Sequence, residues 1–403
     1  MDFKDTAPEA KFRAEARNWI EANVEPLKPD EDPFEHGRRF QAKKQQAGWA
    51  CLTWPKEHGG RGASVIENLI FDEEMSRYPD QLDAVGLGIS VVAPTLMEYM
   101  SDEQKKRYLP KIASGEEVWC QLFSEPAAGS DLAGVLTKAE RDGDDWIING
   151  QKTWTSIAQH SHFGILVARS DSQAAKHKGL TYFFVDMRSP GVEVKSIKQN
   201  TGEAHFNETY FTNVRIPDSQ RLGDIGSGWR VALHTLMNER TYFGNQGSIK
   251  NPDVRSLVGL AQKTNYLDHS GLENGAIRDR IADLYIRESG LKHTRNRFKT
   301  SISKGEEPGP ENSIGKFVRG KLAQEISSFC LDLLDGAGAA MDSDLVPGDG
   351  FMQMSYMRTP GARLAGGSDE IQLNILAERV LGLPQDIRVD KGMPFIDIPK
   401  GPA

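Results

Sequence analysis

The most informative stretch of the chain reads Gln121-Leu122-Phe123-Ser124-Glu125-Pro126-Ala127-Ala128-Gly129-Ser130-Asp131-Leu132-Ala133-Gly134. It mixes small, hydroxylated and acidic residues with Pro and Gly, which predicts a loop that another molecule can approach closely rather than a regular core element. A second stretch reads Ile147-Ile148-Asn149-Gly150-Gln151-Lys152-Thr153-Trp154-Thr155-Ser156. Its last three residues offer one aromatic wall and several hydrogen-bonding groups. By composition alone, both stretches could equally be ordinary surface turns.

The composition is that of an ordinary globular protein with two or three packed units. The chain has 403 residues, of which 38% are hydrophobic and 26% charged, and its net charge is −8. The negative charge argues against a nucleic-acid surface. Cys51, Cys120 and Cys330 are scattered singly, which suits a reducing compartment and provides no zinc site.

Targeting and membrane signals are not found in the sequence. No run approaches the roughly 20 apolar residues that a membrane helix needs. The first residues are too polar for a secretory signal and too acidic for a transit peptide. We therefore expect a cytoplasmic protein without membrane insertion.

Periodicity divides the chain into helical, β-rich and helical parts. Apolar residues recur at helical spacing from about residue 8 to residue 117, with a break at Ser101-Asp102. Short β-prone runs follow between residues 118 and 217, at 146–148, 163–168 and 180–185. Helical periodicity returns after Pro217 and continues almost to the end. The fold class is therefore α+β, with expected domains at 1–117, 118–228 and 229–403.

The helix that begins near Gly228 carries a candidate catalytic carboxylate. On a helical wheel one apolar stripe forms, with Arg240 in its middle and Glu239 at its edge; the stripe consists of Trp229, Ala232, Leu233, Leu236 and Phe243. A charge on a buried face is expensive unless it is paired or functional. The two residues are thus either an ion pair bridging to another helix or a carboxylate in a partly apolar pocket, suited to be a general base. The stripe could also end before residue 239.

A second candidate site precedes the last long helix. Gly366 and Gly367 come before Ser368 and Asp369, and Gln372 stands three residues after Asp369, which predicts a capped helix start with a bare backbone. Such a start suits polar or anionic ligand atoms, but a helix entry without a ligand has the same pattern. No HExxH, GxSxG or P-loop motif occurs and the nine histidines lack ligand spacing, so no metal site is expected.

Taken together, these segments closely resemble the acyl-CoA dehydrogenase family over essentially the whole chain. Besides the two stretches quoted first, the segments 47–62, 102–115 and 377–384 are similar to family signatures. The resemblance implies an N-terminal α-helical domain, a middle β-barrel and a C-terminal four-helix bundle. It also implies FAD between barrel and bundle, and a dimeric or tetrameric assembly.

The resemblance implies roles for particular residues. Those next to FAD would be Gln121, Leu122, Phe123, Ser124, Gly129, Ser130, Trp154, Thr155, Ser156, Ser368, Asp369 and Glu370. Ser124 would lie near the reactive edge of the flavin, and Ser130 would also touch the substrate. The implied reaction is α,β-dehydrogenation of an acyl-CoA thioester, with the flavin as electron sink and an electron-transfer flavoprotein as the acceptor.

Two departures from the family pattern concern the substrate pocket. Most members carry the base at the position occupied here by Gly366, and a glycine cannot serve as a base. A minority carry it where this chain has Glu239-Arg240. We therefore assign Glu239 as the base and Arg240 as a neighbour that shapes the pocket. Bulkier residues are common at Ala365-Gly366, so their loss predicts a wider pocket for branched, aromatic or polycyclic acyl groups, including steroid-derived ones.

A third departure concerns contacts that usually reach FAD across a subunit interface. The Arg-x-Gln-Phe-Gly element is missing from residues 262–269, and Gln-x-x-Gly-Gly is reduced to Leu333-Leu334-Asp335-Gly336-Ala337-Gly338. Related enzymes of steroid catabolism resemble heterotetramers, so a homologous partner subunit is expected, with a homo-oligomer as the alternative. Two other functions stay open: a non-catalytic partner subunit, and a flavin oxidase or monooxygenase on the same fold.

Overall fold

The computed structural model describes residues 5–78, 83–245, 251–266, 269–303, 309–341, 346, 348–388 and 390–399. The chain forms two compact units. The first, called here the sheet unit, consists of Thr6–Asn245 and Asp386–Ala403, and the second, the bundle unit, consists of Met1–Asp5 and Gln246–Gln385. Among the described residues, no helix is long and apolar enough to cross a membrane.

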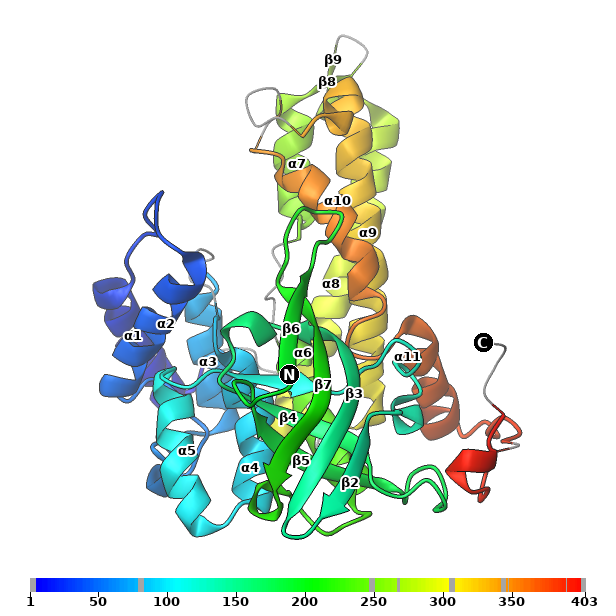
Figure 1. The fold of residues 1–403 in the computed structure, drawn as a ribbon. Helices are drawn as coiled ribbons and strands as arrows, with labels where there is room; N and C mark the ends of the chain where they lie inside the picture. Colours follow the sequence, from blue (N-terminus) through cyan, green and yellow to red (C-terminus); the bar gives the residue numbers. More distant parts are fainter. Residues whose placement is uncertain are drawn as a thin grey trace. The chain divides into compact units, whose positions relative to one another are not determined.

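Helices form the amino-terminal part of the sheet unit, coloured blue to cyan in Figure 1. They are α1 (Ala7–Asn23), α2 (Pro33–Gln46), α3 (Val65–Met75), α4 (Ala93–Tyr99) and α5 (Asp102–Ser114). Thr6, Ser64 and Ser101 cap α1, α3 and α5 by reciprocal hydrogen bonds with the Glu or Gln three residues on. The expected helical region and its break at Ser101 are therefore confirmed.

A twisted mixed sheet follows (Figure 1, cyan to green). Its strands are β1 (Trp119–Leu122), β2 (Lys138–Asp142), β3 (Asp145–Ser156), β4 (Phe163–Arg169), β5 (Leu180–Asp186), β6 (Val192–Ile197) and β7 (Phe206–Pro217). Their order is β1-β4-β2-β3-β7-β6, and β5 pairs with β4. In register, Gly164 of β4 lies opposite Cys120 of the parallel β1 and opposite Val185 of the antiparallel β5. Apolar side chains on the two faces of these strands belong to two separate core clusters, one of which also contains residues of α4 and α5.

The structure corrects two expectations about this region. Gln121 and Leu122 are not loop residues but the end of β1, and Leu122 is fully buried. The stretch ending at Ser156 is not a turn but the long strand β3. The expected β-prone runs do lie in β3, β4 and β5, whereas β2, β6 and β7 were not expected.

The helix α6 (Gly228–Asn245) belongs to the sheet unit and packs against β5 and α4. Its buried face is formed by Val231, Ala232 and Thr235, so the expected apolar stripe is only partly right. Leu233 was placed in that stripe but is 42% exposed. The side chains of Arg240 and Phe243 lie outside the described residues.

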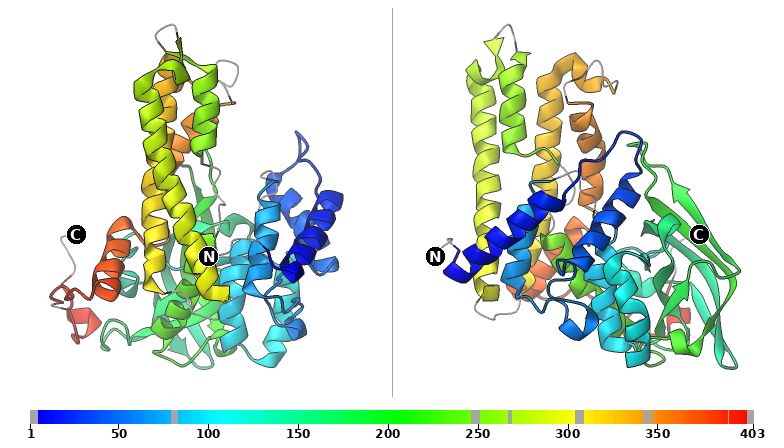
Figure 2. Two further views of the ribbon diagram at one scale, coloured as in Figure 1. Left: turned by 180° about the vertical axis from the view of Figure 1, so that it is seen from behind. Right: turned by 90° about the vertical axis from the view of Figure 1, so that its left-hand side faces the viewer.

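The bundle unit is helical. Its elements are α7 (Val254–Lys263), α8 (Gly275–Ser303), α9 (Ser313–Leu334), α10 (Phe351–Ala362) and α11 (Asp369–Ile375), with a short hairpin of β8 (Asn265–Tyr266) and β9 (His269–Ser270). The long helices α8 and α9 lie side by side (Figure 2), and Arg287 of α8 is paired with Glu325 of α9. Leu257, Leu284, Ile326 and Cys330 are buried between the helices. The chain thus has an N-terminal helical part, a middle half-barrel sheet and a C-terminal helical part, whereas the three domain boundaries stay predictions.

Candidate functional site

The candidate base lies beside the first residue of the informative stretch. Glu239 is on α6, and its Oε2 accepts a 2.8 Å hydrogen bond from Nε2 of Gln121 on β1. A hydrogen bond donated to a carboxylate favours its ionised form, and only the ionised form can take up a proton. The structure thus brings together two residues that the sequence pointed to separately, one as a cofactor contact and one as the base.

Buried hydroxyl groups fix the part of α6 that carries Glu239. Thr235 stands one helical turn earlier, and its Oγ1 is 2.9 Å from the hydroxyl of Tyr182 and 3.0 Å from Oγ1 of Thr95. All three residues are fully buried. Burial raises the pKa of Tyr182 well above its usual value, and the negative charge of Glu239 adds to the increase. This chain of hydroxyls therefore ties α6 to β5 and α4, and the sequence offered no signal for it beyond polar residues inside apolar runs.

A buried ion pair anchors the loop that follows β1. The ammonium group of Lys152 on β3 is 2.8 Å from Oε1 of Glu125 and donates to the Phe123 carbonyl at 3.0 Å. The Glu125 carboxylate also accepts hydrogen bonds from the backbone amides of Leu136 (2.6 Å) and Thr137 (3.0 Å). Both ends of the loop are thus fastened to the interior of the sheet.

The charged state of Glu125 follows from these contacts. Burial raises the pKa of its carboxyl, but the charge of Lys152 and the hydrogen bonds from Lys152, Thr137 and Leu136 outweigh burial and lower the pKa below its usual value. A buried pair of this kind is stable only while both partners are present and hydrogen-bonded. Sequence reasoning missed Lys152 and Glu125 as a pair, although both lie within the two stretches quoted first.

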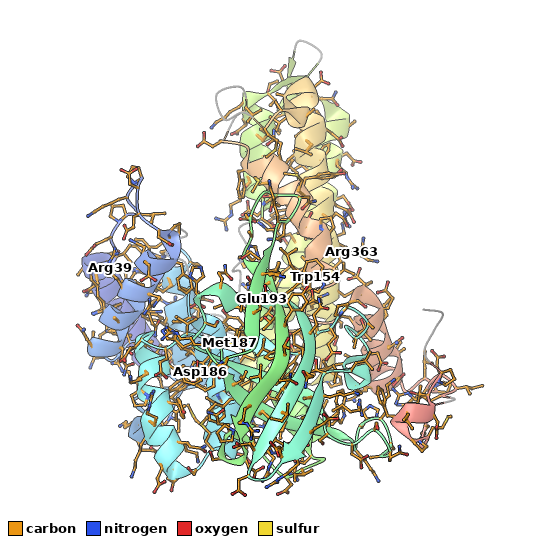
Figure 3. The ribbon with its side chains drawn as sticks, in the orientation of Figure 1. Arg39, Trp154, Asp186, Met187, Glu193 and Arg363 are labelled. Carbon is orange, nitrogen blue, oxygen red and sulfur yellow. The ribbon has the colours of Figure 1, made fainter. Side chains whose placement is uncertain are left out.

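An irregularity in β3 turns Trp154 outward. The register between β3 and β7 shifts between Lys152 and Thr155, which is the mark of a bulge, and Trp154 has a left-handed φ of 58°. Its ring is 57% exposed, near the carboxyl end of β3 (Figure 3). Just before it, the amide of Thr153 donates to the Ser124 carbonyl at 2.9 Å, so the bulge also holds the loop. Strained, exposed aromatic residues of this kind are typical of functional sites.

The other predicted cofactor contacts of the sheet unit differ in exposure, and therefore in whether their side chain or only their backbone can reach a ligand. Gly129 and Ser130 are exposed, and Ser124 and Ser156 are half-buried. Leu122 and Phe123 are buried, so they can meet a ligand only through their backbone. Thr155 is buried, and its Oγ1 has no hydrogen-bond partner among the described residues. An exposed loop, an outward aromatic ring and an unused hydroxyl together fit a flat, polar-edged group such as a flavin.

The predicted contacts of the bundle unit lie at the start of α11. Gly366 and Gly367 both have left-handed φ values, of 64° and 87°. The expected capping arrangement is wrong in detail, because Ser368 is the N-cap and Gln372 donates to the Gly366 carbonyl instead. Asp369 is buried and its Oδ2 accepts a 2.7 Å hydrogen bond from Arg363 (labelled in Figure 3).

Glu370 and the three cysteines differ in exposure and in the direction in which their pKa values are shifted. Glu370 is exposed, and hydrogen bonds from its own backbone amide and from Ser368 lower its pKa. The three cysteines are free and buried, and burial raises the pKa of each thiol to about 12. In the part of the chain that the structure describes, no cluster of three or more His, Cys, Asp or Glu side chains could hold a metal ion.

Comparison with known families matches the chain in three consecutive segments. Residues 6–116 match the model of the acyl-CoA dehydrogenase N-terminal domain. Residues 120–214 match the middle domain, and residues 226–381 match the C-terminal domain.

Individual relatives agree with this match. The chain is 36% identical over 397 residues to a protein named acyl-CoA dehydrogenase IpdE1 of Mycobacterium tuberculosis, covering 94% of this chain and 98% of that protein. Among solved structures it is similar to a steroid ACAD, Tcur3481-Tcur3483, with a TM-score of 0.81, 27% identity, and coverage of 96% of this chain and 100% of the other. The ChsE4-ChsE5 complex from Mycobacterium tuberculosis has a TM-score of 0.80, 27% identity and the same coverage.

Proposed function

The chain belongs to the acyl-CoA dehydrogenase family of oxidoreductases, and on this premise we propose that it catalyses the FAD-dependent α,β-dehydrogenation of an acyl-CoA thioester. The product is the 2,3-enoyl-CoA, and the electrons pass to an electron-transfer flavoprotein in the cytoplasm. The observation that carries the proposal is the hydrogen bond between Gln121 and Glu239. It holds a carboxylate beside the first residue of the stretch 121–134, called here the flavin signature.

In this proposal Glu239 removes the α-proton of the thioester, and the proton ends on its carboxylate. Gln121 keeps the carboxylate ionised and oriented before the transfer. Gly366, at the position where most family members carry the base, has no side chain to offer. FAD, when bound, supplies the acceptor for the β-hydrogen, which leaves with its electron pair. Arg240 shapes the acyl pocket next to the base.

The predicted FAD contacts of the sheet unit fit a bound flavin. In the sheet unit the ring would lie on residues 121–130, where Leu122 and Phe123 offer only backbone groups, and Trp154, Thr155 and Ser156 would cover its other side. Two observations support this assignment: the unused, buried hydroxyl of Thr155, and the free space around Gly129, where a Cβ would meet no atom within 4 Å. Ser368, Asp369 and Glu370 are cofactor contacts that the family resemblance predicts.

A bulky, branched or polycyclic acyl group is the proposed substrate, and steroid-derived acyl-CoA is the leading example. Ala365 and Gly366 are both exposed and present at most a methyl group to a ligand. Ser130, also exposed, would bind the thioester part of the substrate. The similarity to a solved steroid ACAD supports the same assignment.

A second, homologous subunit is the proposed partner. The elements that would reach FAD across an interface are missing at residues 262–269 and reduced at 333–338, and Leu267 and Asp268 lie outside the described residues. The similarity to the ChsE4-ChsE5 complex supports a heteromeric assembly. A homo-oligomer is the alternative, and full FAD occupancy of the chain purified alone would favour it.

The test of the proposal is anaerobic titration of the purified protein, alone and with its partner subunit, with acyl-CoA esters. A flavin spectrum that bleaches with a bulky acyl-CoA supports the dehydrogenase, whereas bleaching only by short straight chains overturns the substrate assignment. A protein that never bleaches is the non-catalytic subunit, and rapid oxygen consumption during turnover indicates an oxidase or monooxygenase.

The base is tested by Glu239→Gln, which keeps the shape of the side chain and removes proton abstraction. Flavin reduction should slow by about 10²- to 10⁴-fold while substrate still binds. Glu193→Gln is the matched control, because Glu193 is an exposed glutamate of the same unit that pairs with Lys195 on β6. A Glu239→Gln variant that reduces flavin at the parent rate would refute the assignment.

A further inference from the structure

The segment Asp390–Pro399 returns to the sheet unit and lies along the loop between β4 and β5. The amide of Phe395 donates to the Ala174 carbonyl, and the amide of Ile396 donates to the Ser172 carbonyl, both at 3.0 Å. Pro394 forms an antiparallel bridge with Ala175. The segment is therefore docked through its backbone, in a defined register.

Beneath this segment, Arg169 at the end of β4 holds the loop that carries the flavin signature. Arg169 is buried, and its guanidinium group donates to the carbonyls of Ala133 (2.6 Å), Val135 (3.3 Å) and Lys176 (2.8 Å). Its backbone amide also donates to the Thr137 carbonyl at 2.7 Å. One side chain thus fixes the second half of the loop to the edge of the sheet.

Phe395 covers the face of that guanidinium group. The ring of Phe395 is buried, and Arg169 Cζ lies 3.5 Å from its centroid. Burial lowers the pKa of Arg169 to about 10, opposed by the charges of Glu125, Asp131 and Asp171. An aromatic face stabilises a cation that has lost its water, and it excludes water that would compete for the carbonyls.

A second contact, through Lys176, links the segment 390–399 to the loop 131–137. The ammonium group of Lys176 is 2.6 Å from Oδ2 of Asp131, in the flavin signature, and 3.3 Å from Oδ2 of Asp390. The Lys176 side chain is largely buried, so these pairs are less screened than ordinary surface pairs. Two independent bridges, through Arg169 and through Lys176, therefore connect residues 390–399 with residues 131–137.

We propose that residues 390–399 are a clamp that positions the loop 131–137, and that Phe395 is its positioning residue, acting through Arg169. The role of this loop in the cofactor site rests on the function proposed above. Phe395 touches neither cofactor nor substrate in this proposal. It keeps the Ala133 and Val135 carbonyls in place, and with them the turn that follows Ser130.

The first test is hydrogen exchange of the full-length protein without added FAD. Phe395→Leu, which keeps apolar volume but removes the aromatic face, should speed amide exchange in residues 131–137 by about tenfold. Phe395→Tyr, which keeps an aromatic ring, should leave amide exchange in residues 131–137 at the parent rate. Ile396→Ala is the matched control, since Ile396 is the adjacent residue and is 53% exposed. Exchange in β4 and β5 should stay unchanged in every variant, which separates loop release from unfolding. Equal exchange in Phe395→Leu and parent would overturn the clamp.

The second test is the affinity of the FAD-free protein for FAD, followed by flavin fluorescence. Phe395→Leu should weaken binding about tenfold, and Ile396→Ala should leave it unchanged. Asp390→Asn, which breaks the second bridge, should weaken it in the same direction. If the parent binds FAD and Phe395→Leu binds it equally well, the inference is wrong while the proposed function stands. If the parent binds no FAD even when it is assembled with its partner subunit, the proposed function fails, and the exchange result alone decides whether the clamp exists.

Discussion

Gln121 and Glu239 lie 118 residues apart in the chain, and their side chains meet at 2.8 Å through an amide-to-carboxylate hydrogen bond. The bond joins the end of the strand β1 to the second half of the helix α6. Both β1 and α6 belong to the sheet unit.

Gln121→Leu should slow flavin reduction by about tenfold, because the Glu239 carboxylate loses the hydrogen bond that orients it. Stopped-flow reduction by acyl-CoA measures the rate. In a Glu239→Gln background the second substitution should have no such effect, and an equal loss there would mean that Gln121 acts through another group.

Lys152→Met should destabilise the protein by about 3 to 5 kcal/mol, because it leaves the Glu125 carboxylate buried without its partner. The double variant Lys152→Met/Glu125→Gln should recover part of the loss, since no unpaired charge remains. Urea unfolding followed by far-ultraviolet circular dichroism measures both. A double variant as unstable as the single one would show that the destabilisation comes from lost packing rather than from charge.

The Glu125–Lys152 pair also predicts how the free energy of unfolding changes at low pH. The pKa of Glu125 is lower in the folded protein than its usual value of about 4.3, and hydrogen bonds from Arg221 and Trp146 likewise hold the pKa of Asp218 low. A group with a depressed folded pKa contributes stability above its unfolded pKa and loses it as the pH falls through the folded one. The free energy of unfolding should therefore be steady above about pH 5 and decline below about pH 4. Glu125→Gln combined with Lys152→Met should make the decline shallower.

Trp154→Gly should separate stability from cofactor binding. Glycine relieves the left-handed strain at this position and should stabilise the FAD-free protein by about 1 kcal/mol. FAD affinity should fall about tenfold, because one aromatic wall is lost. Thermal unfolding and fluorescence titration give the two numbers. Phe206→Leu is a useful comparison, since Phe206 meets the edge of the Trp154 ring with 6.0 Å between centroids. A loss of stability in Trp154→Gly would contradict the strain argument.

Gly366→Ala should narrow the acyl pocket. The added methyl group, at a φ of 64°, should lower kcat/KM for a bulky acyl-CoA by about tenfold more than for a short straight-chain one. Gly361→Ala is the control, because Gly361 is exposed on α10 and a Cβ there would meet nothing within 4 Å. A uniform loss across substrates would point to backbone strain and not to pocket size.

Local patterns in the sequence were enough for the helix–sheet–helix order and for the family. Capping residues such as Ser101, and runs of aromatic and β-branched residues such as β5, act over a few residues, so they can be identified from the local sequence. Glu239 was found the same way, from its place on an amphipathic helix. Its bond to Gln121 could not be found, because nothing local links two residues that far apart.

Other features of the structure could not be predicted because the local sequence favours a different conformation or exposure. Gln121 and Leu122 lie in a strand although Gly and Pro follow closely. Lys152 is completely buried, while a lysine in a polar run is normally a solvated one. Residues 390–399 contain two prolines and several charges, and their conformation depends on contacts with the distant residues 169–176, which the local sequence does not reveal.

The clamp also sets an order of events during synthesis. Lys176 and Asp390 are separated by 214 residues, so at ribosomal speeds of about 5 to 20 residues per second roughly 10 to 40 s elapse between their appearance. During that interval the loop 131–137 has been synthesised, but the clamp, residues 390–399, has not. If the clamp is required for tight cofactor capture, nascent chains stay colourless, and the flavin enters only after translation has passed residue 399.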